Sequence, residues 1–149
     1  MKTNSSVPQL PLATRTGSAT LDVVVPFTTR SLTRAALSAA GRLSANLHPL
    51  VRLVRTQIVP FPLQLDSTPV PAQVIRQQLA PLAEEFGADL QICFTRDTRE
   101  GLKYVLSRNS LIVIASPRRW WKTREQRLAA WLSERGYSVV LEFVEKNHA

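Results

Sequence analysis

The chain has little of the residues that build metal centres, disulfide frameworks and catalytic nucleophiles. Its 149 residues include one cysteine, Cys93, and two histidines, His48 and His148. A single cysteine excludes an internal disulfide and is typical of a reducing compartment. Neither histidine has a cysteine or histidine at the spacing of metal ligands, so we expect no metal site. No histidine is placed to activate Cys93, which we interpret as a small buried apolar residue.

Glycine is also scarce, with five in the chain and none between Gly101 and Gly136. Glycine lets a backbone adopt positive φ angles and approach a phosphate closely. The sequence has no glycine-rich dinucleotide fingerprint, no Walker-type loop and no nucleophile elbow. No two carboxylates are spaced as an acid–base couple, and we interpret Asp97 as a helix cap. These absences predict a protein that is not an enzyme and has no catalytic residues.

Long apolar runs are missing as well. No run reaches the roughly 18 residues that cross a bilayer, and the first 20 residues contain no apolar stretch of signal-peptide length. We therefore predict a cytoplasmic protein. Residues 1–20 are rich in Ser, Thr and Pro and are predicted to form a disordered tail, which leaves one domain over residues 21–146.

Positive charge is abundant, with a formal net charge of +8. This excess favours anionic partners, namely nucleotides, nucleic acid, acidic protein surfaces or anionic lipid. The alternative is that arginine serves only as an ordinary surface residue, because the cations are spread along most of the chain. The exception is residues 118–127, where one acid, Glu125, stands among the cations Arg118, Arg119, Lys122, Arg124 and Arg127.

Apolar runs alternate with helical spacings along the rest of the chain. Strands are predicted at residues 21–27, 50–59, 88–94, 111–115 and 137–144, with a helix in each of the four intervals. Regular alternation of this kind implies parallel strands joined by right-handed crossovers. Pro81 predicts a kink or break in the second helix, and Trp131 of the fourth helix is predicted to lie in the core.

Helix starts are marked by polar residues. Thr28 and Thr29 precede the first helix, and either suits the N-cap position. Asp97 with Glu100, and Thr123 with Gln126, have the spacing of capping boxes before the third and fourth helices.

Several local patterns repeat those of one known family. They are an opening apolar strand (21–27) followed by an alanine-rich helix (32–47), a long loop after the second strand (60–72), a polar turn after the third (95–98), and a strand with an Ala-Ser end (109–116). In this order they resemble the universal stress protein family, over about residues 21–145. The resemblance implies an α/β fold, a Rossmann-like three-layer sandwich with a five-stranded parallel sheet of order 3-2-1-4-5.

The resemblance also implies where a ligand would bind. In such sheets ligands lie beyond the carboxyl ends of the strands, at the switch point between strands 1 and 4. Here that places Thr28, Thr29 and Arg30 opposite Ser116 and residues 117–122.

The usual ATP site of the family is not expected in this chain. ATP-binding members carry an acidic residue just after the first strand, where this chain has Pro26, Phe27 and Thr28. They also carry a motif after the fourth strand that reads Gly, two residues, Gly, nine residues, then Gly with Ser or Thr. This chain has no glycine there, so we expect no cofactor, with ATP or AMP as the alternative.

The stretch after the fourth strand holds the one candidate site, made of Arg118, Arg119, Trp120, Trp121 and Lys122. Guanidinium and ammonium groups suit phosphate or another small anion, and indole faces suit a base or ring. The alternative is that an indole fills the groove that a nucleotide would occupy while the cations face solvent.

The last strand is predicted to form a homodimer interface. In the order 3-2-1-4-5 it is an edge strand, and its residues Val139, Val140, Leu141 and Phe143 make that edge apolar. Universal stress proteins commonly dimerise through this strand. The alternative is an edge protected by charged residues, namely Glu142, Glu145 and Lys146.

The function predicted from these features is that of a universal-stress-protein-like domain of the non-ATP-binding kind. It would act in stress response or regulation through protein contacts or by sensing an anion. One alternative is an ATP- or AMP-binding stress protein that uses a rebuilt basic loop and has weak ATPase activity. A second alternative, a nucleic-acid-binding module, depends on charge alone.

Overall fold

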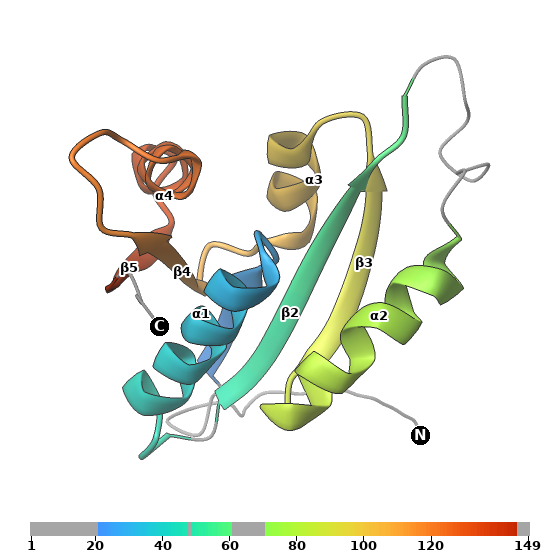
Figure 1. The fold of residues 1–149 in the computed structure, drawn as a ribbon, viewed down its shortest axis with the longest axis horizontal. Helices are drawn as coiled ribbons and strands as arrows, with labels where there is room; N and C mark the ends of the chain where they lie inside the picture. Colours follow the sequence, from blue (N-terminus) through green and yellow to red (C-terminus); the bar gives the residue numbers. More distant parts are fainter. Residues whose placement is uncertain (1–20, 48, 61–70, 146–149) are drawn as a thin grey trace, which may run out of the picture.

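The computed structural model describes residues 21–47, 49–60 and 71–145, so the predicted tail over residues 1–20 lies outside the described residues. Strands and helices alternate along the described chain, as the sequence predicts. They are β1 (Leu21–Pro26), α1 (Arg30–Leu43), β2 (Pro49–Ile58), α2 (Ala72–Glu85), β3 (Asp89–Thr95), α3 (Thr98–Val105), β4 (Leu111–Pro117), α4 (Arg124–Glu134) and β5 (Ser138–Val144) (Figure 1).

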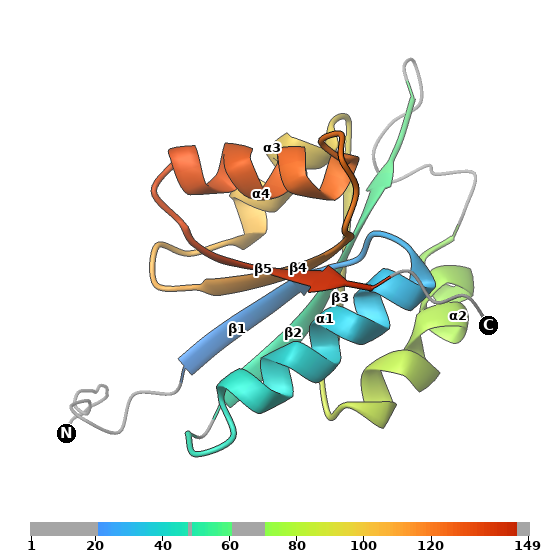
Figure 2. The same ribbon diagram turned by 60° about the vertical axis from the view of Figure 1, so that its left-hand side comes forward.

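The five strands form one parallel sheet of order β3-β2-β1-β4-β5, which confirms the predicted topology. β1 lies between β2 and β4, and it pairs with β4 at Val23–Leu111 and Val24–Ile112. Figure 2 shows the sheet between two helix layers, with α1 and α2 on one face and α3 and α4 on the other. The strand order reverses between β1 and β4, so their carboxyl ends diverge there and leave room for a ligand.

The core lies on both faces of β1. Val23, Val24 and Val25 are completely buried, because a central parallel strand is covered on each side. Val23 and Val25 pack with α1 and α2, and Val24 packs with α3 and α4. Burying each valine stabilises the fold by roughly 1.5–3 kcal/mol. None of the helices in the described residues is long and apolar enough to cross a membrane.

Side-chain caps fix the start of three helices near the carboxyl end of the sheet. Thr29 caps α1, and Asp97 caps α3 by accepting a hydrogen bond from the Glu100 amide at 3.1 Å. Thr123 and Gln126 exchange both bonds of a capping box at α4, each at 3.1 Å. At α3 the sequence predicts a complete capping box, but only the hydrogen bond to the Asp97 side chain is present.

The structure differs from two sequence-based predictions about packing. α2 runs without a break through Pro81, whose ring is exposed while Leu79 and Leu82 hold the helix on the sheet. Trp131 is half-buried and lies at the margin of the core beside α3. The guanidinium groups of Arg99 and Arg135 lie over its ring, each 5.1 Å from a ring centroid. The indole therefore contacts both the core and exposed arginines.

Candidate functional site

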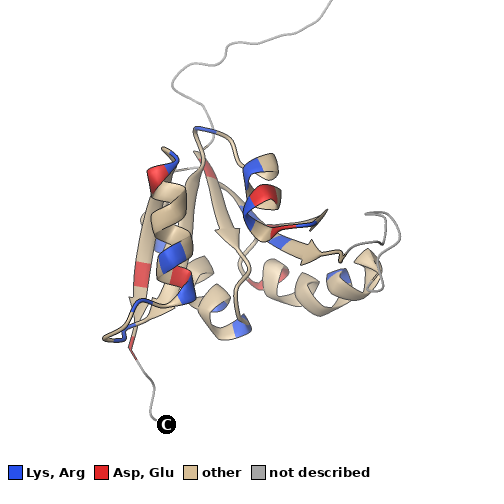
Figure 3. Ribbon diagram, turned by 90° about the horizontal axis from the view of Figure 1, so that it is seen from above, with Lys and Arg blue, Asp and Glu red and all other residues tan. Residues whose placement is uncertain are grey.

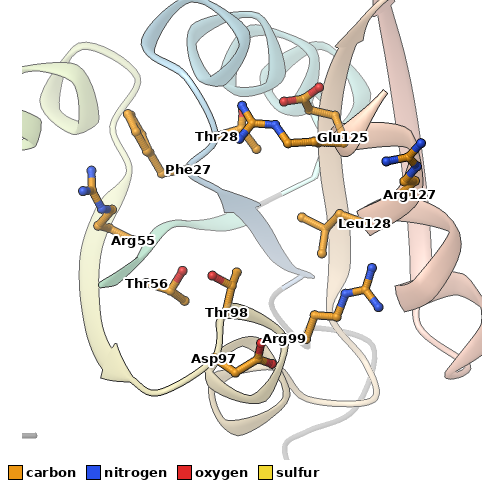
Figure 4. Close-up of a pocket in the computed structure, with 11 residues that line it drawn as sticks. Phe27, Thr28, Arg55, Thr56, Asp97, Thr98, Arg99, Glu125, Arg127 and Leu128 are labelled. Carbon is orange, nitrogen blue, oxygen red and sulfur yellow. The ribbon is translucent and has the colours of Figure 1, made fainter. Parts of the chain in front are cut away.

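A cavity of about 580 Å³ opens beyond the carboxyl ends of β1 and β2, on the sheet face that α3 and α4 cover (Figure 4). That volume is typical of small-molecule sites. Four parts of the chain line it, each near the end of a strand or the start of a helix: Phe27 and Thr28; Arg55 and Thr56; Asp97, Thr98 and Arg99; and Arg124, Glu125, Arg127 and Leu128.

Positive charge dominates this cavity. Four arginines line it, Arg55, Arg99, Arg124 and Arg127, against two acids. The first residues of α3 and α4 also line it, so two helix N-termini add their partial positive charge. Guanidinium groups bind phosphates and carboxylates through paired hydrogen bonds. The cavity is therefore suited to an anion.

Two of the arginines, Arg55 and Arg99, contact neighbouring side chains, and the other two are exposed. Arg55 donates to Gln57 at 3.1 Å and lies 5.1 Å from the Phe27 ring centroid. Arg99 lies over the Trp131 ring. Within the described residues, the side chains of Arg124 and Arg127 make no hydrogen bond or ion pair.

Polar and apolar groups complete the lining. The threonine side chains of Thr28, Thr56 and Thr98 bring hydroxyl groups that both donate and accept hydrogen bonds. Phe27 and Leu128 contribute apolar surface. A ligand with an anionic group and a less polar body matches this combination.

Glu125 is the unusual member of the lining. Its residue surface is 7% exposed, and its carboxylate has no hydrogen bond or ion pair within residues 21–47, 49–60 and 71–145. Figure 4 shows Glu125 on the opposite side of the cavity from Asp97 and Arg99. Buried carboxylates without partners are costly, and those in native proteins usually have an explanation. A hydrogen-bond donor on a ligand would satisfy this one.

Asp97 is engaged in local structure. Besides capping α3, it donates its amide to the Thr95 hydroxyl at 3.2 Å, and that hydroxyl donates to the Asp97 carbonyl at 2.8 Å. The interpretation of Asp97 as a helix cap is confirmed. Its geometry is fixed by the turn between β3 and α3.

The site residues predicted after β1 do not lie together, because they are on different faces of the sheet. Thr28 lines the cavity. Thr29 caps α1, and Arg30 donates to the Gln78 carbonyl of α2 at 3.3 Å, on the other face of the sheet. Ser116, which the sequence predicts to lie opposite Thr28 at the ligand site, belongs to β4 and is completely buried.

The predicted residues of the 118–122 loop do not line the cavity. Arg118 pairs with Glu145 at 3.4 Å and lies over the Phe143 ring, 4.8 Å from its centroid. Arg119 lies 5.4 Å from the Trp121 ring centroid. Lys122 borders a second, shallower hollow between α4 and β5. Figure 1 shows this loop, between β4 and α4, projecting away from the sheet.

The two tryptophans of the loop face solvent. Trp120 is 91% exposed and Trp121 is 48% exposed. Their rings contact each other edge to face, with centroids 5.2 Å apart at 90°. The alternative that an indole fills the groove is therefore wrong for this cavity, because neither ring lines it.

Sequence reasoning missed most of the residues that line the cavity. Arg55 and Arg99 are 44 positions apart in the sequence, and they meet because β2 pairs with β3, the strand that leads into α3. A signal was available for Arg99, because it follows a recognised cap, Asp97, at a helix start. Arg124 and Arg127 were counted in the basic stretch but not assigned to the site.

Metal-binding and nucleophilic chemistry find little support in the described part of the chain. It contains no group of three or more His, Cys, Asp or Glu residues that could hold a metal ion. Cys93 is half-buried in β3, and its sulfur lies 3.9 Å from the carbonyl oxygen of Gly101. Burial raises the pKa of the Cys93 thiol, which disfavours the reactive thiolate.

Comparison with known proteins identifies the fold. No family model matches the sequence, and no curated protein sequence matches it. Among solved structures, the chain is similar to the crystal structure of a universal stress protein in complex with cAMP, with a TM-score of 0.54 and 17% identity. The match covers 84% of this chain and 98% of the other. The chain therefore has the fold of the universal stress proteins.

Proposed function

We propose that this protein is a non-enzymatic, universal-stress-protein-like domain that senses a small anion in the cavity and acts through protein contacts in stress response or regulation. The observation that carries the proposal is the gathering of four arginines and two helix N-termini around about 580 Å³. Such a site binds phosphate or carboxylate through charge-assisted hydrogen bonds. A binding role needs no catalytic group, and Asp97 is occupied as a cap.

A triphosphate is not the ligand that we propose. Residues 118–122, at the place of the family's phosphate motif, contain no glycine and do not line the cavity. The cavity offers guanidinium side chains instead of a main-chain cradle. A ligand with one phosphate needs fewer hydrogen-bond donors than a triphosphate does. The similar structure is in complex with cAMP, which supports a mononucleotide such as AMP as the second candidate ligand.

The proposed ligand also carries a hydrogen-bond donor. Glu125 brings a buried carboxylate without a partner to a lining that is otherwise basic. The Glu125 carboxylate would repel an anion that has no hydrogen-bond donor. If the ligand has a hydroxyl or amine next to its anionic group, that hydroxyl or amine could donate a hydrogen bond to the carboxylate. Phosphate esters of hydroxylated compounds have both features.

Titration calorimetry with inorganic phosphate, AMP, cAMP and ATP tests the proposal. The variant Arg99→Ala with Arg127→Ala should bind the preferred ligand at least tenfold more weakly, since a hydrogen bond to a charged group contributes about 1.5–3 kcal/mol. Arg76→Ala is the matched control, because Arg76 is exposed on α2 at the other face of the sheet. Equal affinity of the double variant and the wild type would refute the proposed site.

The absence of catalysis is tested separately. Phosphate release from ATP by the purified protein should not exceed that of a protein-free blank. Release that disappears in Asp97→Asn or Glu125→Gln would establish instead the alternative with weak ATPase activity.

We further propose that the protein is a homodimer that pairs through β5. In the described sheet β5 pairs with β4 alone, so its outer edge is open. Phe143 is 38% exposed, and Val139, Val140 and Leu141 are each partly exposed. An open apolar edge is prone to pair with another strand.

A further inference from the structure

The 118–122 loop carries an exposed aromatic tip with a basic rim. Trp120 is 91% exposed and Trp121 is 48% exposed, and Arg118, Arg119 and Lys122 are all exposed beside them. Figure 3 shows Lys and Arg along this loop and the start of α4. Three cations against one nearby acid, Glu145, leave a local charge of +2. None of the five loop residues lines the cavity, so the loop is free for a second role.

The loop is held firmly at its base and not at its tip. The buried hydroxyl groups of Ser116 and Thr123 lie 2.6 Å apart across that base. The Arg118 amide donates to the Val144 carbonyl of β5 at 3.3 Å. The indoles pack edge to face on each other, with ring centroids 5.2 Å apart. The fold therefore leaves Trp120 almost fully exposed and Trp121 about half exposed.

We propose that the 118–122 loop is a membrane-contact element, which inserts Trp120 and Trp121 into the headgroup region of an anionic bilayer. Tryptophan is enriched at membrane interfaces because its ring is amphipathic. Arginine and lysine beside an inserted ring gain from the negative surface of the bilayer. An exposed apolar patch with a polar rim marks an interaction site for a protein or a membrane, and the two indoles with their basic rim form such a patch.

The shape of the loop favours a lipid surface over nucleic acid. Single strands bind where successive bases stack on open ring faces along a basic groove. Here the rings are perpendicular, and the Arg119 guanidinium lies 5.4 Å from the Trp121 centroid, over one of its faces. Neither tryptophan lines either hollow found in the described residues. A projecting tip suits a deformable surface that closes around it.

The resulting attachment is weak and reversible. Two indoles and three cations form a small contact, and stable anchoring requires more than one such signal. Because part of the attraction is electrostatic, salt should weaken it.

Sedimentation of the full chain with lipid vesicles tests the proposal. Vesicles of phosphatidylcholine alone are compared with an equimolar mixture of phosphatidylcholine and phosphatidylserine, and tryptophan emission is recorded in parallel. We expect binding to the mixed vesicles, a blue shift of the emission, and release by salt. Trp120→Ala with Trp121→Ala, and Arg119→Glu with Lys122→Glu, should each reduce binding at least tenfold.

Tyr104→Ala is the matched control, because Tyr104 is 87% exposed on α3, outside the loop. It should bind vesicles like the wild type. The proposal is overturned if the wild type does not bind the mixed vesicles, or if the double tryptophan variant binds them as well as the wild type does. It is also overturned if Tyr104→Ala reduces vesicle binding as much as the double tryptophan variant does. It is also overturned if a single-stranded oligonucleotide, and not the vesicles, changes the emission of Trp120 and Trp121.

Discussion

Arg52 of β2 donates two hydrogen bonds to the Asp22 carboxylate of β1, one from Nε and one from Nη2, each 3.0 Å long. The Ser110 hydroxyl adds a third bond to the same carboxylate at 2.7 Å. This cluster ties β1 to β2 and to the start of β4, at the opposite end of the strands from the cavity. Both charged side chains are less than a quarter exposed.

The first prediction concerns stability against pH. Burial raises the pKa of Asp22, but the hydrogen bonds from Arg52 and Ser110 and the Arg52 charge outweigh it, so the pKa lies below its usual value. Because the folded pKa is the lower one, the stabilisation is complete above the unfolded pKa, about 3.9, and is lost as pH falls through the folded value. Asp22→Asn should destabilise the protein at neutral pH by about 1–3 kcal/mol.

Urea unfolding of both proteins from pH 7 to pH 2 checks this prediction. The gap between the unfolding free energies of wild type and Asp22→Asn should narrow below about pH 4. A gap that stays constant with pH would mean that the Asp22 charge does not stabilise the fold.

The second prediction compares two glycines in helices. A Cβ at Gly101 would lie 2.9 Å from Cγ2 of Thr95 and 3.3 Å from Cγ2 of Thr56, so α3 lies too close to the sheet for alanine. Gly101→Ala should destabilise the fold by about 1–3 kcal/mol. It should also weaken anion binding, since α3 begins at the cavity.

Gly41→Ala is the control for that change. Gly41 is exposed in α1, and a Cβ there would meet nothing within 4 Å. Alanine should stabilise the helix by about 0.5–1 kcal/mol. Thermal unfolding should therefore shift in opposite directions for the two variants, and a shared direction would contradict the described packing of α3.

The third prediction concerns Glu125. Glu125→Gln removes a buried charge without a partner, so the free protein should become more stable, by about 1 kcal/mol. Inorganic phosphate should bind more tightly because a repulsive charge is gone. The preference for AMP over phosphate should fall, since a neutral acceptor binds a donor more weakly than a carboxylate does.

Calorimetry and thermal unfolding measure both effects on one sample. If Glu125→Gln is less stable than the wild type and leaves the ratio of the two affinities unchanged, Glu125 has a structural role and does not contact the ligand.

The fourth prediction concerns the proposed dimer. Phe143→Glu places a charge on the open edge of β5 and costs little within the monomer, because Phe143 is 38% exposed. Light scattering should give a mass of twice the 16.6 kDa chain mass for the wild type. For the variant it should give the mass of one chain. A wild type of single mass at micromolar concentration would end the dimer proposal.

The sequence carries the fold more clearly than the site. Continuous apolar runs such as Val23 to Val25 identify buried parallel strands, and the resemblance supplies their order, which the structure confirms. The site depends on which strand ends meet in space. The basic stretch after β4 is conspicuous in sequence, but the contact between Ser116 and Thr123 closes its base and its tip projects outward. Arg55 and Arg99 come together through the pairing of β2 with β3 and the position of α3 after β3.

Tryptophan illustrates a second limit. Helical spacing predicts that Trp131 is buried, but an amphipathic ring can satisfy the same spacing at the margin of the core. There it packs with two arginines, Arg99 and Arg135, that are distant or unremarkable in sequence. Helical periodicity shows which face is turned inward but not how deeply the face is buried.

Amide chemical shifts of the isotopically labelled protein during titration with AMP and with inorganic phosphate test the basic cavity most directly. The shifts should concentrate at Thr28, at Thr98 and Arg99, and at Arg124 and Glu125, which line the cavity. They should leave the 118–122 loop unchanged. Shifts confined to that loop, or no saturable shifts at all with either anion, would contradict the proposal that the carboxyl end of this sheet is an anion site.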